Sequence, residues 1–229
     1  MTLRPPHHSV YLETLRSSAG EEPALGEFVE LVRRAFDRAF IVNIGSASLR
    51  LQRAPEGGSV PILNLDLHPI CNVDLVADAH YLPFRDGIVP GLILKCVFEH
   101  VPHPFIVRDE LKRVLRPGGY VYAKIPFLQP YHAAPDDFHR FTQNGVRELF
   151  RDFQIVREGV SVGPSSALTW LLVEYLGILF SFDTDRGYQI SRTLWSYPLT
   201  LFKYLDVFFR NRRESHRLAS AFYIIAQAP

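Results

Sequence analysis

The sequence predicts an α/β protein built on a doubly wound, mostly parallel sheet, with a helical insertion before the last strand. Short apolar runs, typical of buried parallel strands, alternate with segments of helical periodicity. Two of those runs lead directly into an aspartate, Asp66 in ILNLDLHP and Asp78 in DLVADAHYLPF. Ligands of such sheets bind just beyond the carboxyl ends of the strands. We therefore expect Asp66 and Asp78 to flank a single crevice.

The expected strands are apolar runs of four to nine residues. They comprise 40–44, a run beginning at Ile62, 73–77, 92–96, 120–125, 154–162 and 219–226. The first of them ends at Gly45, where the backbone must turn sharply.

Three helices are expected in the α/β domain, one before the first strand and two between later strands. The first carries apolar residues on one face and should cover the edge of the sheet; they are Leu25, Phe28, Val29, Val32 and Phe36. The second spans 104–115, and the turn RPGG at 116–119 stops it. Thr142 is expected to cap the third.

Composition limits the classes of partner. The 229 residues are 47% hydrophobic and 21% charged, which suits one globular domain with an appended subdomain. A formal net charge of +1 provides no large basic field, so we expect no nucleic-acid partner. Cys71 and Cys96 lack CxxC spacing, which indicates reduced thiols in a cytoplasmic protein without a metal site. The N-terminal residues lack the apolar stretch of a signal peptide, which argues against export.

The chain divides into three parts on this pattern. Residues 1–23 form an arm, 24–163 and 218–229 form the α/β domain, and 164–217 form the insertion. Residues 167–182 are apolar almost all round, but they are shorter than the roughly 20 residues of a membrane span and include Glu174.

The next helix of the insertion should be amphipathic. Its apolar face comprises Leu201, Phe202, Leu205, Phe208 and Phe209. The polar face has Lys203, Asp206, Arg210 and Arg213, and basic residues gather at its end as Arg210, Arg212, Arg213 and Arg217. Such a helix suits peripheral contact with an anionic inner membrane surface and a lipid-linked acceptor. The alternative is a helical hairpin that packs on the domain as a lid or forms a homodimer contact.

Four segments occur together in a recognisable order. They are VDLVADAHYLPF, VFEHVPHPF, ELKRVLRPGGYVYAKIPF and PFLQPYHAAPDDFHRFT. On these segments the chain resembles the class I S-adenosylmethionine (SAM)-dependent methyltransferases, whose fold is Rossmann-like. The resemblance is to the methyltransferase-11-like branch associated with glycan and cell-envelope biosynthesis, and it covers about residues 40–142. It implies SAM as cofactor and a small-molecule, glycan or lipid-linked acceptor.

The resemblance also implies which residues bind the cofactor. Its methionine part would lie against NIGSAS, that is Asn43, Gly45, Ser46 and Ala47 with their neighbours, and Asp66 would bind the ribose diol. The adenine would meet Asp78, Ala79 and His80, and His100 would line the pocket. The alternatives are a surface role for Asp66, a turn cap for Asp78 and a structural role for His100.

The first motif departs from the family pattern. Ala47 replaces a frequent second glycine, and Asn43 stands where many relatives have an acid. Alanine at a position of positive φ costs on the order of 1 kcal/mol, so cofactor binding could be weakened or lost. The Asn43 amide can still hydrogen-bond the turn.

The acceptor chemistry is expected in the last of the four segments. A methyl transfer to a hydroxyl benefits from a general base. We expect His132 to be that base, with Asp137 orienting it and Arg140 binding an anionic group. The alternative is that Asp137 and Arg140 form a structural ion pair that fixes the loop.

Three functions follow from these residues. The first is a cytoplasmic SAM-dependent methyltransferase that O-methylates a sugar, glycolipid or other envelope precursor. The second is a non-catalytic protein of the same fold whose altered first motif no longer binds SAM and whose insertion is an interaction surface. The third, a nicotinamide-dependent enzyme, is disfavoured because the chain lacks GxGxxG before a long helix.

Overall fold

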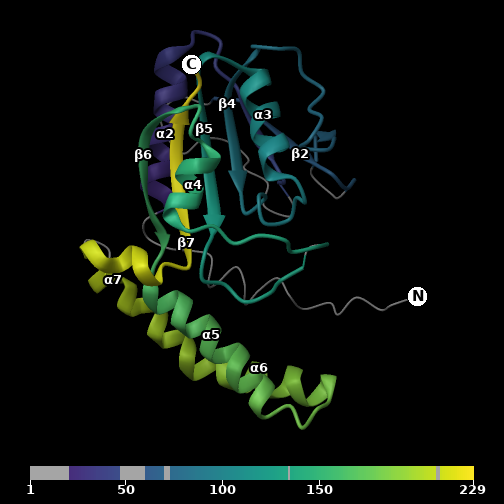
Figure 1. Cartoon of the computed structure of the whole chain (residues 1–229), viewed down its shortest axis with the longest axis vertical. Coiled ribbons are helices and arrows are strands. Elements are labelled where there is room, and N and C mark those ends of the chain that lie inside the picture. Colours follow the sequence, from purple (N-terminus) through teal and green to yellow (C-terminus); the bar gives the residue numbers. More distant parts are fainter. Residues whose placement is uncertain (1–20, 47–59, 70–72, 134, 210–211) are drawn as a thin grey trace. The chain divides into compact units, whose positions relative to one another are not determined.

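The computed structural model of the protein describes residues 21–46, 60–69, 73–133, 135–209 and 212–229. Its centre is a seven-stranded sheet of order β3-β2-β1-β4-β5-β7-β6 (Figure 1). The strands are β1 Ile41–Ile44, β2 Ile62–Asp66, β3 Leu75–Val76, β4 Val89–Lys95, β5 Leu115–Pro126, β6 Gln154–Val162 and β7 Ala221–Gln227. The predicted doubly wound, mostly parallel sheet is confirmed.

The strand order reverses direction at β1. The chain runs outward from β1 through β2 to β3, and then returns to place β4 on the other side of β1. Strand β1 pairs in parallel with both, Ile41 lying opposite Ile62 of β2 and opposite Gly91 of β4. In open parallel sheets such a reversal marks the place where ligands bind, outside the carboxyl ends of the strands.

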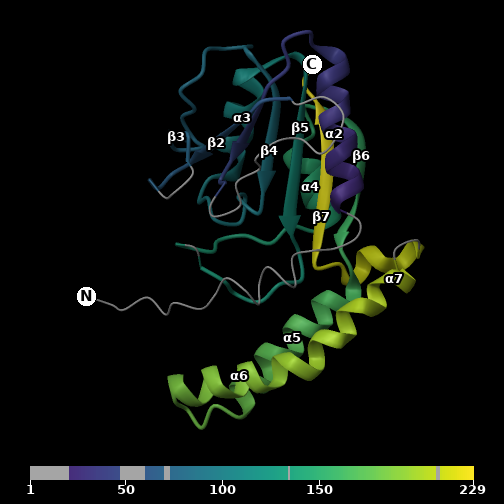
Figure 2. The same ribbon diagram turned by 180° about the vertical axis from the view of Figure 1, so that it is seen from behind.

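Helix α2, Glu21–Ala35, packs on a face of the sheet and not on its edge, so the edge position expected from sequence is wrong. The ring of Phe28 lies 6.0 Å from that of Tyr122 in β5. A Cβ atom on Gly91 of β4 would lie 2.8 Å from Cγ2 of Val32. The missing side chain of Gly91 therefore lets the helix approach the middle of the sheet. Helices α3 and α4 cover the opposite face (Figure 2).

Helix α3, Pro104–Val114, has almost the predicted limits, but the segment after it differs from expectation. Strand β5 begins at once with Leu115, so the RPGG residues lie inside the strand instead of forming a separate turn. The pairing with β4 shifts register between Val89 and Gly91, and Gly118 takes φ +74°. A bulge at the start of the strand thus accommodates these residues.

Helix α4, Gln143–Leu149, begins where it was expected. Its capping residue is Thr142, whose hydroxyl oxygen accepts a hydrogen bond from the Gly145 N–H at 3.1 Å. Strand β6 has the limits read from sequence, and β7 lies within two residues of its expected start.

A helical segment forms most of a second compact unit, which comprises Val160–Ala221 with Leu128–Pro130. The other unit comprises Glu22–Phe127, Tyr131–Gly159 and Phe222–Pro229. The helices of the former are α5 Pro164–Leu179, α6 Asp185–Thr200, the 3-10 helix η1 Leu201–Leu205, α7 Asp206–Phe209 and the 3-10 helix η2 Arg213–Leu218. Among the described residues, none of the helices has both the length and the apolarity to cross a membrane.

Glu174 joins the two long helices. Its carboxylate, with a side chain 16% exposed, accepts hydrogen bonds from Trp170 Nε1 at 3.3 Å, from the Tyr188 hydroxyl and from Arg192 Nε at 2.8 Å. Burial and the bond to Glu174 raise the pKa of Tyr188 to about 12. The acid that interrupts the apolar run thus holds α5 against α6.

The single amphipathic helix expected after α6 is wrong. Residues Leu201–Leu205 form a 3-10 turn and Asp206–Phe209 a short α-helix. Asp206, expected on the solvent face, accepts hydrogen bonds from the backbone N–H groups of Ser165 and Ser166 at the start of α5. That carboxylate thus satisfies free N–H groups at the start of another helix and is not directed to solvent. Arg210 lies outside the described residues.

Candidate active site

Two sharp turns meet at the reversal of the sheet. Gly45, the first residue after β1, takes φ +67°, and Cys96, the first after β4, takes φ +58°. A Cβ atom on Gly45 would lie 2.5 Å from Cγ2 of Val97, which follows Cys96. The turns are thus packed against each other, and only glycine fits at Gly45. Cys71 lies outside the described residues.

Asn43 is used inside the sheet and not at the turn, contrary to expectation. Its side-chain amide donates to Asn64 Oδ1 of β2 at 3.0 Å. Asn64 in turn donates to Asp74 through its backbone N–H at 2.8 Å and its amide at 3.2 Å. This polar row, buried at Asn43 and Asn64 and exposed at Asp74, ties β1 to β2 and to the residue just before β3, because each group satisfies the next.

The two predicted acids stand at the carboxyl ends of neighbouring strands. Asp66 is the last residue of β2, and its carboxylate accepts a hydrogen bond from the His68 N–H at 3.0 Å. Asp78 lies two residues after β3 and accepts from the N–H of His80 at 2.9 Å and from its ring Nδ1 at 2.6 Å. Parallel pairing of β1, β2 and β3 puts all three ends at one edge of the sheet.

Asp78 is held in its charged form. Burial acts to raise the pKa of Asp78, but the hydrogen bonds from the backbone and ring of His80 outweigh burial and lower this pKa. Its side chain remains 45% exposed, so the carboxylate can still accept a bond from a ligand.

Two buried polar atoms at this edge have no hydrogen-bond partner among the described residues. They are Oγ of Ser46, after β1, and Nε2 of His80, after β3. Since Nδ1 of His80 donates to Asp78, Nε2 carries a lone pair. Unsatisfied buried polar atoms suggest a ligand. These atoms, the Gly45 turn and the two acids fit the polar groups of an adenosyl cofactor. Ala79 is buried between Asp78 and His80, and Ala47 lies outside the described residues.

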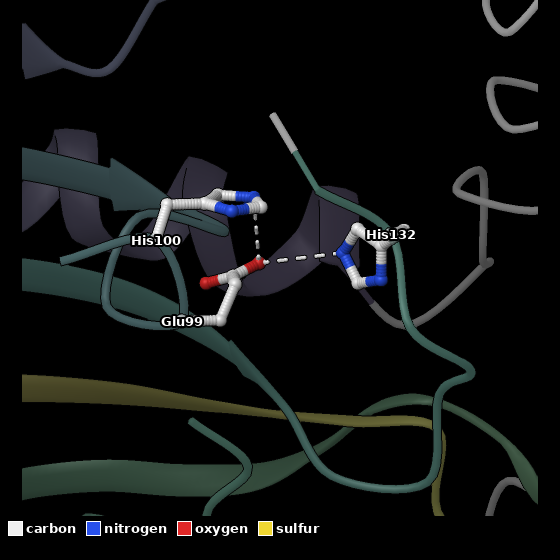
Figure 3. Close-up of side chains that lie close together, drawn as sticks. All are labelled: Glu99, His100 and His132. Atoms are coloured by element: carbon white, nitrogen blue, oxygen red, sulfur yellow. Dashed lines mark ion pairs between the residues drawn. The ribbon is translucent and has the colours of Figure 1, made fainter. Parts of the chain in front are cut away.

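A carboxylate and two imidazoles converge beyond β4 and β5 (Figure 3). Oε1 of Glu99 lies 3.7 Å from Nε2 of His100 and 3.9 Å from Nε2 of His132. The two rings are 5.5 Å apart and nearly perpendicular. Glu99 is fully buried, and both its carboxylate oxygens lack a hydrogen-bond partner among the described residues.

The hydrogen bonds of the two rings differ. Nδ1 of His100 lies 2.6 Å from the carbonyl oxygen of Asp136 and therefore carries a proton, so in a neutral ring Nε2 has the lone pair. Nδ1 of His132 lies 3.2 Å from Nη2 of Arg140, which can only donate. In a neutral ring that contact places the His132 proton on Nε2.

Asp137 and Arg140 form a two-fold ion pair beside His132. Arg140 donates from Nη1 to Oδ1 at 2.5 Å and from Nη2 to Oδ2 at 2.6 Å. Oδ2 also accepts from the His132 backbone N–H at 2.8 Å, but it lies 3.7 Å from Nδ1 of that ring. Burial acts to raise the pKa of Asp137, yet Arg140 and the His132 N–H bring this pKa down to about 2. The pair fixes the loop after β5.

Glu99 lies at the centre of the cluster, a role that its residue type and position in the sequence did not reveal. The available signal was the doublet Glu99-His100 directly after a buried strand, at the edge where ligands bind. What sequence could not show is that the Glu99 side chain is fully buried and lies between the two imidazoles.

Comparison with known proteins agrees with this architecture. Residues 25–123, less than half of the chain, match a family model described as a methyltransferase domain. No curated protein sequence matches the chain significantly. The matched region is described as a methyltransferase domain, and the sheet that it includes has the fold expected for it.

Solved structures share the fold at low sequence identity. A SAM-dependent methyltransferase from Archaeoglobus fulgidus is 15% identical, with a TM-score of 0.55 over 96% of this chain and 99% of that one. A putative sarcosine dimethylglycine methyltransferase from Galdieria sulphuraria is 12% identical, with a TM-score of 0.53 over 90% of this chain and 84% of that one. The [4+2]-cyclase SpnF is 15% identical, with a TM-score of 0.53 over 90% of this chain and 82% of that one. The fold thus occurs in proteins named for different reactions.

Proposed function

We propose that the protein is a SAM-dependent methyltransferase that O-methylates a sugar, glycolipid or other cell-envelope precursor. The observation that carries the proposal is the placement of cofactor-type and proton-transfer groups at one edge of the sheet. Gly45, Asp66 and Asp78 stand at the ends of or just after β1, β2 and β3, and His100 and His132 stand beyond β4 and β5. SAM bound at the first three would face an acceptor at the last two.

Each cofactor group has a residue suited to it. The carboxylate of Asp66 would accept hydrogen bonds from the ribose hydroxyls, which contribute about 1.5–3 kcal/mol each when the acceptor is charged. Asp78, Ala79 and His80 would meet the adenine. Gly45 and Ser46 would meet the methionine part, where the unpartnered Ser46 Oγ can bond its polar end. Asn43, engaged with Asn64, supports the strand below them.

The acceptor hydroxyl would meet the Glu99 cluster. Orientation of the hydroxyl in line with the methyl group can lower the barrier by roughly 7–11 kcal/mol, so the main task of these side chains is positioning. One imidazole takes the hydroxyl proton. His132 was expected to do so, but the lone pair on Nε2 makes His100 ready for it in the present arrangement. Asp137 and Arg140 position His132 through their ion pair.

The helical unit supports an apolar, lipid-linked acceptor and peripheral contact with the inner membrane surface. Many of its large apolar side chains are exposed, and Phe182, Tyr197, Leu201 and Phe208 are each more than two-thirds exposed. A pocket of about 520 Å³ opens at the α5–α6 end, and the stacked rings of Phe180 and Trp195 line it. Exposed aromatic and aliphatic side chains of this density favour an interface with lipid or protein.

The activity is tested by transfer of a labelled methyl group. The wild-type protein and Asp78→Ala are incubated with methyl-labelled SAM and with separate polysaccharide and lipid extracts of an envelope. We expect label in one of the extracts with wild type and a strong reduction with the variant. Label in neither extract, with SAM bound, would reject the proposed acceptor class.

Membrane contact is tested by sedimentation with anionic and neutral vesicles. Phe182→Ser with Tyr197→Ser should lower the bound fraction, while Ile106→Ser, an exposed residue of α3, should not. Unchanged sedimentation, together with a dimer that only the double variant disrupts, would favour the homodimer contact instead.

The second candidate is a non-catalytic protein of this fold. The alanine at position 47 favours it, because a glycine is frequent there. It predicts no binding of SAM or S-adenosylhomocysteine by the wild-type protein.

A further inference from the structure

Glu99 is a buried carboxylate that has no counter-charge in direct contact among the described residues. Its side chain is fully buried, and neither carboxylate oxygen has a hydrogen-bond partner among the described residues. An isolated buried carboxylate is strongly unfavourable unless it is paired or coordinates a metal. The nearest charged or titratable groups are the two imidazoles at 3.7 and 3.9 Å, too far for hydrogen bonds.

His100 is oriented as a metal ligand would be. Its Nδ1 donates to the backbone carbonyl of Asp136, so Nε2 presents a lone pair toward the carboxylate of Glu99. A lone pair facing a carboxylate is repulsive, and a cation between them turns the repulsion into two attractive contacts. Ligating histidines usually donate their other ring nitrogen to a carbonyl or carboxylate in this way.

We propose that Glu99, His100 and His132 bind one divalent first-row transition-metal ion. The three ligand atoms lie within 4.8 Å of one another. Two imidazoles and one carboxylate form the donor set of several zinc and iron(II) sites, and the set leaves coordination positions open. This site departs from the sequence-based expectation that the protein has none.

Small movements would close the coordination sphere. Ligand atoms about 2.1 Å from a metal are roughly 3.0–3.5 Å apart, and the Glu99 contacts exceed this range by under 1 Å. His132 must also shift its proton from Nε2 to Nδ1. The ring would then turn so that the Nδ1–H group leaves Arg140 Nη2 and donates a hydrogen bond to Asp137 Oδ2, which now lies 3.7 Å away. Arg140 keeps its own bonds to Asp137.

The metal site adds a means of activating the acceptor to the proposed function. Only this catalytic role of the metal rests on the proposed function; metal binding itself does not. An oxygen bound to a divalent cation loses its proton near neutral pH, so an acceptor hydroxyl on the open position would be activated there. His100 and His132 would then be ligands, and neither would take the proton. If the metal activates the hydroxyl, a chelator should abolish methyl transfer. If an imidazole is the base, the rate of methyl transfer should not change when a chelator is added.

Cobalt(II) is the probe, because its absorption spectrum separates nitrogen and oxygen ligands from thiolate. The full chain carrying His7→Gln and His8→Gln, which removes the histidine pair near the N-terminus, is stripped with a chelator and titrated calorimetrically without SAM. We expect one Co²⁺ per chain without a thiolate band. Glu99→Gln should weaken the binding by more than about 10-fold, and His139→Gln, on the same loop but outside the cluster, should not.

A second measurement guards against misfolding of the variants. Co²⁺ should raise the melting temperature of the parent and of His139→Gln, and leave that of Glu99→Gln and His100→Asn unchanged. No saturable binding by the parent, a thiolate band, or equal affinity in Glu99→Gln would overturn the proposal. Because SAM is absent, such a result would leave methyl transfer itself untouched.

Discussion

Gly45 and Val97 pack so closely that a single added carbon atom would not fit between them. A Cβ atom on Gly45 would lie 2.5 Å from Cγ2 of Val97, and Gly45 also takes φ +67°. The two residues follow β1 and β4, the strands between which the sheet reverses. Their contact fixes the relative position of the turn proposed for the cofactor and the turn that leads to Glu99.

Gly45→Ala should destabilise the protein by about 1–3 kcal/mol, because it adds both the strain of positive φ and the clash with Val97. It should also weaken binding of S-adenosylhomocysteine. The matched control is Gly26→Ala in α2, where a Cβ meets nothing within 4 Å and alanine should stabilise by about 0.5–1 kcal/mol. Urea denaturation measures both changes. Equal stability of the two variants would show that the turns are not packed as described.

Asp137 should make stability depend on pH in the acid range. Its folded-state pKa, about 2, lies below the ordinary 3.8, so its contribution is present above pH 3.8 and is lost as pH falls toward 2. Wild type should therefore exceed Asp137→Asn by up to about 2 kcal/mol at pH 7, and the difference should shrink between pH 4 and pH 2. Denaturation series at several pH values check this. A difference independent of pH would contradict the ion pair with Arg140.

Glu174→Ala should destabilise the helical unit by about 2–3 kcal/mol, because it leaves the indole N–H of Trp170 and the guanidinium of Arg192 without their shared acceptor. The control is Glu214→Ala, which removes an exposed pair with Arg217 and should change stability by less than about 0.5 kcal/mol. Thermal melts followed by circular dichroism compare them. A similar small effect for both would mean that Glu174 does not join α5 to α6.

The proton acceptor can be identified by pH–rate profiles of His100→Gln and His132→Gln. If His100 takes the proton, His100→Gln should lose the acid limb of the profile and up to about 10²–10⁴-fold in rate. His132→Gln should keep that limb and lose less in rate. The opposite result would return the role to His132. Acid limbs preserved in both variants would place proton removal on neither ring.

Much of the fold was predictable because buried strands and amphipathic helices leave strong local patterns. Strand β6 and the Thr142 cap were located to the residue. The position of α2 on a face of the sheet was not predicted. It depends on the close approach of Val32 to Gly91, and the sequence does not distinguish Gly91 from other glycines in strands. The role of Asp206 was not predicted either, since its carboxylate bonds to the start of α5, forty residues earlier in the chain.

The sequence predicted which kinds of residue lie at the carboxyl edge of the sheet, but not how their side chains contact one another. Asp66 and Asp78 were expected there because parallel strands share their carboxyl edge. The ion pair of Asp137 with Arg140 was one of two roles considered for them. In the other, Asp137 orients His132 and Arg140 binds an anionic group. The convergence of Glu99 with His132 was not foreseeable, because it joins two loops and follows from tertiary packing.

The central claim is that the acids beyond β2 and β3 bind an adenosyl cofactor. Its most direct test is calorimetric titration of S-adenosylhomocysteine into wild type, Asp66→Ala and the control Asp37→Ala, which alters an exposed aspartate before β1. We predict one site per chain in wild type and control, and at least a 10-fold loss of affinity in Asp66→Ala. Absence of binding to wild type, or equal affinity in all three proteins, would contradict it.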